Sequence, residues 1–407
     1  MKRGREEGKS SGFMKHILAA CAMVFVLVLC PMNCRPAWGA DIDMDDSGDS
    51  LEDGTNLSDY DFSDIESFLE KNIKRGGWRL SFAELIKELL KGEVKEAASM
   101  TVQAVKQGLF QEIGGNGQLL LQIVLLGMAG AVFTSFSGVF AANQVSETGF
   151  FVTYLLLFSY LAVSFFTSIS LAEDTLERIL EFMKLLMPSY FLAVAFSGGS
   201  ASSIALYETM FFAVSFVEWL FARVLLPFVR IYLLLSLAGH IAKEDMLSRM
   251  TDLIKAGISW GIKTAAGAVL GIHLLQGMIL PYIDAVKNST MEKAVEAIPG
   301  VGKGVEIAAQ LMLGSGILIK NTMGAAAALI LLVITAVPIV KLAVLCFMYQ
   351  CAAAALEPVC DKRIISCVSA AAEAHKILLK LLAYSMLLFT IAIAIICNAT
   401  NAVYFSR

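Results

Sequence analysis

The sequence predicts an all-α, polytopic membrane protein with about seven or eight transmembrane helices. The chain has 407 residues, of which 57% are hydrophobic and 17% are charged, whereas soluble domains carry roughly a quarter charged residues. The mean hydropathy is +0.69. The apolar residues gather in long runs, and a run of about 20 apolar residues is what a helix needs to cross a bilayer. A single compact soluble domain does not fit this composition.

Residues 1–39 have the pattern of a signal peptide. An apolar run from Ile17 to Cys30 is too short for a comfortable span, and Ala37 and Gly39 supply small residues on either side of Trp38. The basic residues that precede the run are Lys2, Arg3, Arg5, Lys9 and Lys15. We expect cleavage near Gly39, and an uncleaved anchor helix is the alternative.

Residues 40–77 are expected to form an acidic disordered linker and a short helix. The stretch 41–66 holds eleven Asp and Glu residues and no Lys or Arg. Such a segment cannot bury enough apolar surface to offset the entropy of ordering it.

Residues 78–117 are expected to form an extracytoplasmic amphipathic helical region. Ser81 and Glu84 fit a capping box at its start, and the glycines from Gly114 to Gly117 break it at its end. Apolar residues recur at helical spacing in between, at Phe82, Leu85, Ile86, Leu89, Leu90 and Val94. Its apolar face needs a partner, for which the membrane surface or the chain's own bundle is favoured over another subunit.

Residues 118–407 are expected to form the polytopic membrane domain. The apolar runs predict spans at 118–139, 150–171, 184–199, 204–221, 224–240, 258–282, 322–346 and 379–400. The run 184–199 is short and contains Pro188, so a re-entrant hairpin there would reduce eight spans to seven. Eight spans place the basic loops 241–257 and 358–378 in the cytoplasm, as the positive-inside rule favours. The amphipathic segments 246–256 and 305–318 are expected to lie outside the spans.

Helix packing is the function we assign to the glycines around span 258–282. These are Gly257, Gly261, Gly267 and Gly271. The last two form a small-xxx-small pair, which lets helix backbones approach closely within lipid. Lys263 and His273 lie on the same span, but ten residues separate them by about 15 Å of helix rise, so they do not form one site.

Four charged residues interrupt the apolar run 204–240: Glu208, Glu218, Arg223 and Arg230. Ionisable groups within a membrane are costly and often functional. A polar pathway through the bundle is one interpretation of the four residues. Structural pairing, or an interfacial turn between two short helices, is the other.

Nothing in the sequence predicts catalytic, cofactor-binding or metal-binding residues. The glycines from Gly300 to Gly304 surround Lys303, but the spacing and the missing Ser or Thr do not fit a phosphate-binding loop. No serine has a nucleophile-elbow context, and the cysteines after residue 39 lack CxxC spacing. The formal net charge is −4, without a basic tract for nucleic acid. The lipid bilayer is the expected surrounding.

Three segments carry a resemblance to a known family. They are Asn143–Glu147 leading into GFFVTYLLLFSYL, the stretch MPSYFLAVAFSGGSASSIALYE at 187–208, and IPGVGKGVEIAAQLMLGSGILIKNTMG at 298–324. Together with the order of signal peptide, acidic linker, extracytoplasmic helix and membrane domain, they resemble the stage III sporulation protein AE family over essentially the whole mature chain.

The resemblance implies a multi-pass membrane protein of endospore formation, in the mother-cell membrane that surrounds the forespore. It implies a non-enzymatic part of a secretion-like channel complex, or feeding tube, between mother cell and forespore. The implied partners are other products of the stage III sporulation A operon, including a secretion-type ATPase and ring-forming proteins. A homo-oligomer and a scaffold without a pore both stay open. A secondary transporter or permease for a small solute is the alternative function.

Overall fold

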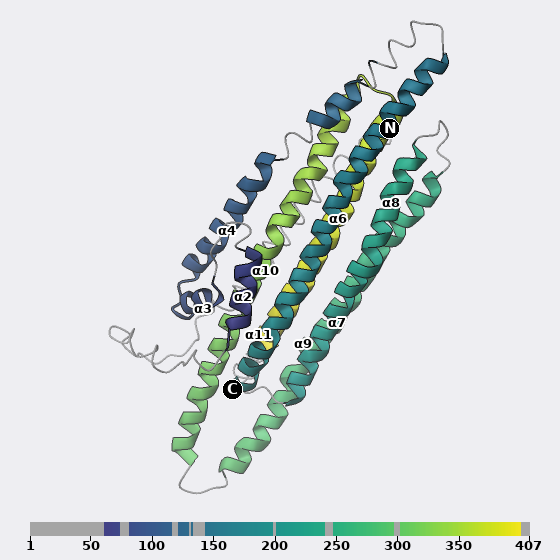
Figure 1. The fold of residues 1–407 in the computed structure, drawn as a ribbon. Helices are drawn as coiled ribbons and strands as arrows, with labels where there is room; N and C mark the ends of the chain where they lie inside the picture. Colours follow the sequence, from purple (N-terminus) through teal and green to yellow (C-terminus); the bar gives the residue numbers. More distant parts are fainter. Residues whose placement is uncertain are drawn as a thin grey trace.

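The protein is an elongated bundle of long α-helices in the computed structural model (Figure 1). The structure describes residues 61–73, 81–115, 121–129, 132, 143–197, 201–240, 247–296 and 302–399. Over these residues it contains helices and no strand, which confirms the predicted all-α class. The expected signal peptide, 1–39, and most of the expected acidic linker lie outside the described residues.

Two groups of helices make up the described chain. The first, an N-terminal arm, consists of α2 (Ser63–Ile73), α3 (Phe82–Leu90) and α4 (Val94–Gly115). The second, the bundle, consists of α6 (Asn143–Phe196), α7 (Ala201–Leu220), the π-helix η4 (Phe221–Leu225), α8 (Leu226–Gly239), α9 (Ser248–Glu296), α10 (Gly302–Leu356) and α11 (Lys362–Ala399). Residues 121–129 are also helical. In Figure 1 the arm lies along one side of the bundle, beside α10.

The runs 150–171 and 184–199, expected as separate spans, belong to one continuous helix. Helix α6 has 54 residues and is therefore about 80 Å long. The polar stretch between the runs does not interrupt the helix, because its apolar face continues through the buried residues Ala172, Leu176, Ile179, Phe182 and Met183. The re-entrant hairpin at 184–199 is wrong for the same reason.

The runs 204–221 and 224–240 are likewise joined. Helices α7, η4 and α8 follow one another without a turn, and the Leu226 N–H donates to the Phe221 carbonyl in the wider π pattern. The interfacial turn expected around Glu218 and Arg223 is therefore a π segment within a helix.

Three further helices also extend past the expected boundaries. Helix α9 includes the amphipathic segment 246–256 from residue 248 onward, and α10 begins at Gly302 and includes 305–318. Most of the expected loop 358–378 lies in α11. Four of the described helices are long and apolar enough to cross a membrane, at Phe151–Phe196, Glu208–Gly239, Gly314–Leu356 and Lys362–Cys397. The expected count of seven or eight is not confirmed.

The arm packs on the chain's own bundle, which was one of the two favoured partners. The expected long helix over 78–117 is instead two helices, because the chain turns at Gly92, whose φ of +79° suits glycine. Helices α3 and α4 both contact α10. The apolar face of α3 is at most 2% exposed at Phe82, Leu85, Ile86 and Leu89.

Polar caps hold the arm helices together. Ser81 caps α3 by accepting from the Glu84 N–H, as expected. Glu66 of α2 adds a second cap, since its carboxylate accepts from the Ser81 hydroxyl at 2.8 Å and from the Ala83 N–H at 2.9 Å. Asp61 precedes α2 and accepts from the Ser63 hydroxyl and N–H, and these bonds lower the pKa of its carboxyl.

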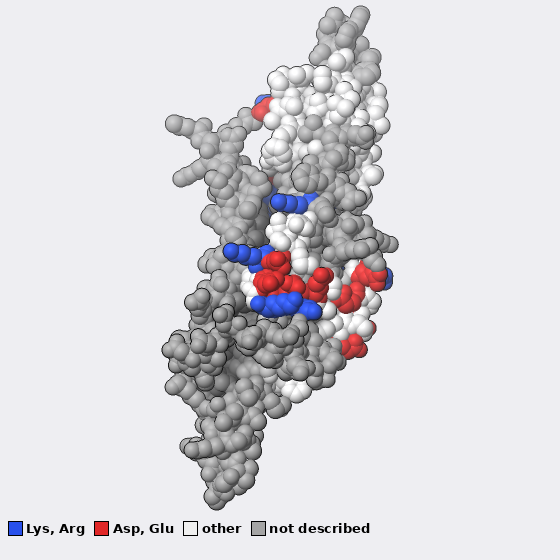
Figure 2. Space-filling view, turned by 90° about the vertical axis from the view of Figure 1, so that its left-hand side faces the viewer, with Lys and Arg blue, Asp and Glu red and all other residues white. Residues whose placement is uncertain are grey.

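The left-hand side of the molecule in Figure 1 faces the viewer in Figure 2. On it, the charged side chains of the described residues gather around mid-height, and the described surface above them is almost uncharged. Helices α2 and α3 lie at this height on the same side in Figure 1. The outward face of α3 and the turn after it carry the exposed residues Glu84, Lys87, Lys91 and Glu93. The arm therefore covers part of the bundle with one apolar face and presents its charges outward.

Helix α11 is the centre of the bundle, since it contacts α6, α7, α8, α9 and α10. Both α11 and α10 carry buried small residues, which allow a close approach of two helices. On α11 these are Ala370, Ala371, Ala372 and Ala374, and on α10 they include Ala352 and Ala353, all buried.

Candidate functional site

The four glycines assigned to helix packing make no close contact with another of the described helices. A Cβ added at Gly257, Gly267 or Gly271 would meet no atom within 4 Å, and one at Gly261 would touch only Leu225, at 3.9 Å. These positions of α9 leave room for a neighbour that the described residues do not supply.

Two glycines of α10, neither among the four assigned to helix packing, make close helix contacts. A Cβ at Gly316 would lie 2.5 Å from the Phe196 carbonyl oxygen at the end of α6. One at Gly324 would lie 2.3 Å from the Cys397 sulfur and 3.0 Å from the Tyr190 hydroxyl oxygen. Only glycine lets α10 come this near to α6 and α11.

A buried lysine lies beside the second of these contacts. Lys320 is fully buried, and its ammonium donates to the Cys397 carbonyl at 3.0 Å. Cys397 is two residues from the end of α11, where the last carbonyls of a helix lack intrahelical partners and attract cations. Lys320 thus joins α10 to the end of α11.

A second interior polar cluster centres on His375 of α11. The imidazole is fully buried, with Nδ1 2.8 Å from the Ala371 carbonyl and Nε2 2.9 Å from the Ser168 hydroxyl. The rings of Phe165 and Tyr349 pack against it. Since a carbonyl only accepts, Nδ1 carries a hydrogen and donates to Ala371. Both nitrogens have partners, so His375 joins α6, α10 and α11 as a hydrogen-bonded core residue.

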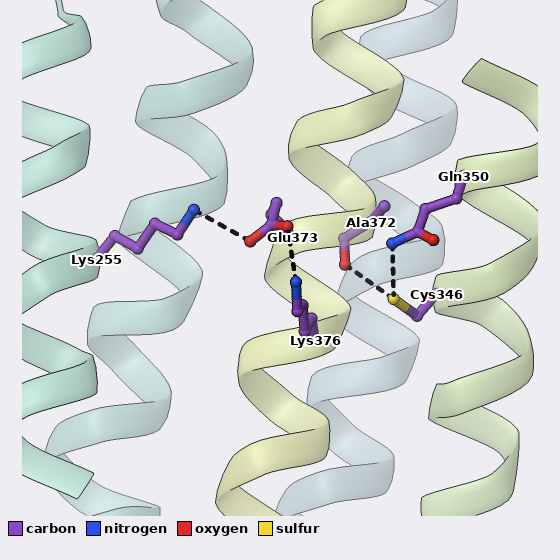
Figure 3. Close-up of polar contacts among 6 residues, drawn as sticks. All are labelled: Lys255, Cys346, Gln350, Ala372, Glu373 and Lys376. Carbon is purple, nitrogen blue, oxygen red and sulfur yellow. Dashed lines mark hydrogen bonds and ion pairs between the residues drawn. The ribbon is translucent and has the colours of Figure 1, made fainter. Parts of the chain in front are cut away.

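An ion-pair group joins α9 to α11 (Figure 3). The Glu373 carboxylate lies 3.0 Å from the Lys255 ammonium of α9 and 3.3 Å from that of Lys376. On another side of α11, the Cys346 thiol donates to the Ala372 carbonyl at 3.4 Å, and the Gln350 amide lies 3.8 Å from its sulfur. Lys255 and Glu373 are over a third exposed, so solvent weakens this pairing.

The four charged residues considered for a polar pathway do not come together. Glu208, Arg223 and Arg230 are exposed on the outside of the described bundle, and the Arg230 guanidinium lies over the Phe166 ring at 5.8 Å. Glu218 alone points inward, with 2% of its surface exposed. Neither of its carboxylate oxygens has a hydrogen-bond partner among the described residues.

Sequence reasoning missed the partners of these interior groups. Neither His375 nor Lys320 was selected as a candidate from the sequence. Their sequence signal is weak, because each lies in an apolar helix at a position that chain topology, not spacing, places against another helix. Of the residues singled out, Glu218 has the most unusual surroundings.

Comparison with known proteins agrees with the sequence resemblance. The family model for stage III sporulation protein AE matches residues 80–400, which include every described helix from α3 to α11. The chain is also 23% identical to the stage III sporulation protein AE of Bacillus subtilis (strain 168) over 315 residues, covering 77% of this chain and 79% of that protein. No solved structure matches the chain.

Proposed function

The chain belongs to the stage III sporulation protein AE family, and we propose on this basis that it is a non-enzymatic membrane component of the channel complex between mother cell and forespore. The observation that carries the proposal is the family match over residues 80–400, because it covers the arm from α3 onward and the whole bundle. A sporulation role follows from the family, and the place in a channel complex is our inference.

The shape of the molecule supports a role in assembly. Helices of 54 and 55 residues are about 80 Å long, far more than the ~30 Å hydrocarbon core of a bilayer. They therefore carry protein surface well beyond one membrane. The charged outward face of the arm and the open glycine positions of α9 offer contact surfaces for the other products of the same operon.

Deletion of the gene in the organism that encodes this chain tests the proposal. Engulfment of the forespore is expected to proceed, while late gene expression in the forespore and the yield of heat-resistant spores are lost. Re-expression of the full chain in the mother cell restores both, and re-expression in the forespore alone does not. Normal spore formation by the deletion strain would contradict the proposal.

A secondary transporter or permease is the second candidate, and the unpartnered Glu218 favours it. Proteoliposomes with the full chain would then take up a small solute, and Glu218→Gln would abolish that uptake while Glu208→Gln, at an exposed carboxylate of the same helix, would not. Normal sporulation by a Glu218→Gln strain would weigh against a transport function in this process.

A further inference from the structure

Glu218 is a buried carboxylate with unused hydrogen-bonding capacity. It is 2% exposed and lies in the candidate span Glu208–Gly239. Buried polar groups in folded proteins nearly always have partners. Among the described residues, both oxygens of Glu218 lack one, and this departure needs an explanation.

Two serines with the same deficiency share the region. The hydroxyls of Ser215 and Ser385 are buried and without partners. Ser215 precedes Glu218 by three residues, which places it on the same side of α7. Ser385 belongs to α11, and its hydroxyl is near enough to the Glu218 carboxylate to influence it electrostatically, although the two groups do not meet hydrogen-bond geometry. Four buried side-chain oxygens, two of Glu218 and one each of Ser215 and Ser385, thus belong to one place, the contact of α7 with α11.

Among the described residues, no positively charged side chain pairs with Glu218. The helices in contact with α7 and η4 are α6, α8, α9 and α11. Their ionisable side chains, with that of η4, include Arg178, Glu181, Arg223, Arg230, Lys255, Lys263, Glu373, Lys376 and Lys380. Among the described residues none of these hydrogen-bonds to the Glu218 oxygens, and Ser385 is the one side chain that interacts with them.

An ionised carboxylate in these surroundings is strongly unfavourable, because it has lost its hydration and has no counter-charge among the described side chains. A divalent cation would not satisfy it, since Ca²⁺ takes six to eight oxygen ligands and Mg²⁺ near-ideal octahedral geometry. The side chains of Glu218, Ser215 and Ser385 offer four oxygens. A proton needs one. The neutral acid has an O–H that can donate and a carbonyl that can accept from a serine hydroxyl.

The backbone next to Glu218 is irregular. The π-helix η4 begins three residues later, at Phe221, and π segments inside α-helices are frequent at functional sites. Pro227 follows in the first turn of α8 and has no N–H to donate to the preceding turn. The regular α-helical hydrogen-bond pattern is therefore interrupted between Phe221 and Pro227, where a change of bending could separate α7 from α11.

We infer that Glu218 is a proton-binding site: it holds a proton while α7 and α11 are in contact, and it releases the proton when α7 moves away from α11 and water reaches the carboxylate. Proton release and helix separation are two sides of one equilibrium, so a rise in pH favours the separated form. The inference rests on the α7–α11 contact and does not depend on the proposed role in sporulation.

Infrared spectroscopy of the purified full-length protein tests this directly, because a protonated carboxylic acid has a carbonyl stretch at higher frequency than a carboxylate or an amide. The wild-type protein at neutral pH is expected to show this band, Glu208→Gln to retain it and Glu218→Gln to lose it. Ser385→Ala keeps the acid and is expected to shift the band to higher frequency, so the test does not depend on Glu218→Gln folding. Absence of the band from the wild-type protein, or its persistence in folded Glu218→Gln, would overturn the inference.

Hydrogen exchange tests the coupled motion. After correction for the intrinsic dependence of exchange on pH, exchange of the amides of residues 215–226 is expected to rise with pH in the wild-type protein. In Glu218→Gln, which stays neutral, it is expected to remain constant. An equal rise in both proteins would show that the helix opens without any link to Glu218.

Discussion

The glycines of α10 and those of α9 occupy opposite kinds of place in the same bundle. At Gly316 and Gly324 a single added carbon would collide with α6 or α11, whereas at Gly267 and Gly271 it would meet nothing within 4 Å. The α9 glycines have the small-xxx-small spacing and the α10 pair, eight residues apart, do not. Spacing therefore indicates where two helices can approach, and only the packed structure shows where they do.

The largest expected effect comes from filling an α10 contact. Gly316→Leu must push α10 away from the Phe196 carbonyl, and overpacking of this kind costs about 3 kcal/mol or more because backbone atoms have to move. Thermal unfolding of the purified protein in detergent measures the loss. The matched control is Gly267→Leu, the same change at an open position. Equal melting temperatures for the two variants would remove the distinction between α9 and α10.

The core around His375 provides the next prediction. His375→Leu leaves the Ser168 hydroxyl without its imidazole partner and is expected to cost about 2 kcal/mol, as for a broken buried hydrogen bond. The same change at the half-buried His240, at the end of α8, is the control and should cost less. If His375→Leu lowers the free energy of unfolding no more than His240→Leu does, the cluster does not hold the three helices together.

A smaller effect is expected at the contact between α9 and α11. Glu373→Gln removes the ion pairs with Lys255 and Lys376, but these groups are partly exposed, so the loss should stay below about 1 kcal/mol. Its dependence on salt is the more telling measurement: added salt should narrow the difference from the wild-type protein. The exposed Glu177→Gln is the control, and a loss at Glu373 that salt leaves unchanged would contradict an electrostatic origin.

The smallest effect on stability is expected on the open face of α9. Gly267→Leu and Gly271→Leu should change the free energy of unfolding by no more than about 0.5 kcal/mol, as is usual for surface positions. We expect them nevertheless to reduce sporulation more than His273→Gln does, because an assembly component needs close helix packing there. Spore counts of the three complemented strains show which substitution reduces sporulation most. A larger defect for His273→Gln than for the glycine variants would favour the transporter function.

The all-α class could be predicted from the apolar runs alone, but the number of helices could not. Hydropathy separates 150–171 from 184–199 because Glu173, Asp174 and Glu177 lie between them. The helix continues there, since Ala172, Leu176 and Ile179 keep one face apolar at the helical period. Where a helix ends depends on whether this apolar period continues. An average of hydropathy over a window of residues does not show the period, so it divided one helix into two spans.

The candidate site could be predicted only in part. Four charged residues stand out within the apolar run 204–240. The sequence alone does not predict that Glu218 faces α11 while the other three face outward. That distinction depends on the packing of helices distant in sequence. The pairing of Lys320 with the end of α11 has the same origin, since 77 residues separate Lys320 from Cys397.

Affinity purification of the tagged full-length chain from sporulating cells tests the assembly function most directly. Membranes are solubilised gently, and cells that express the same tagged chain during vegetative growth serve as the control. The proposed function predicts that other products of the stage III sporulation A operon co-purify with the chain from sporulating cells and are absent from the control. Recovery of the chain without any of them would contradict it.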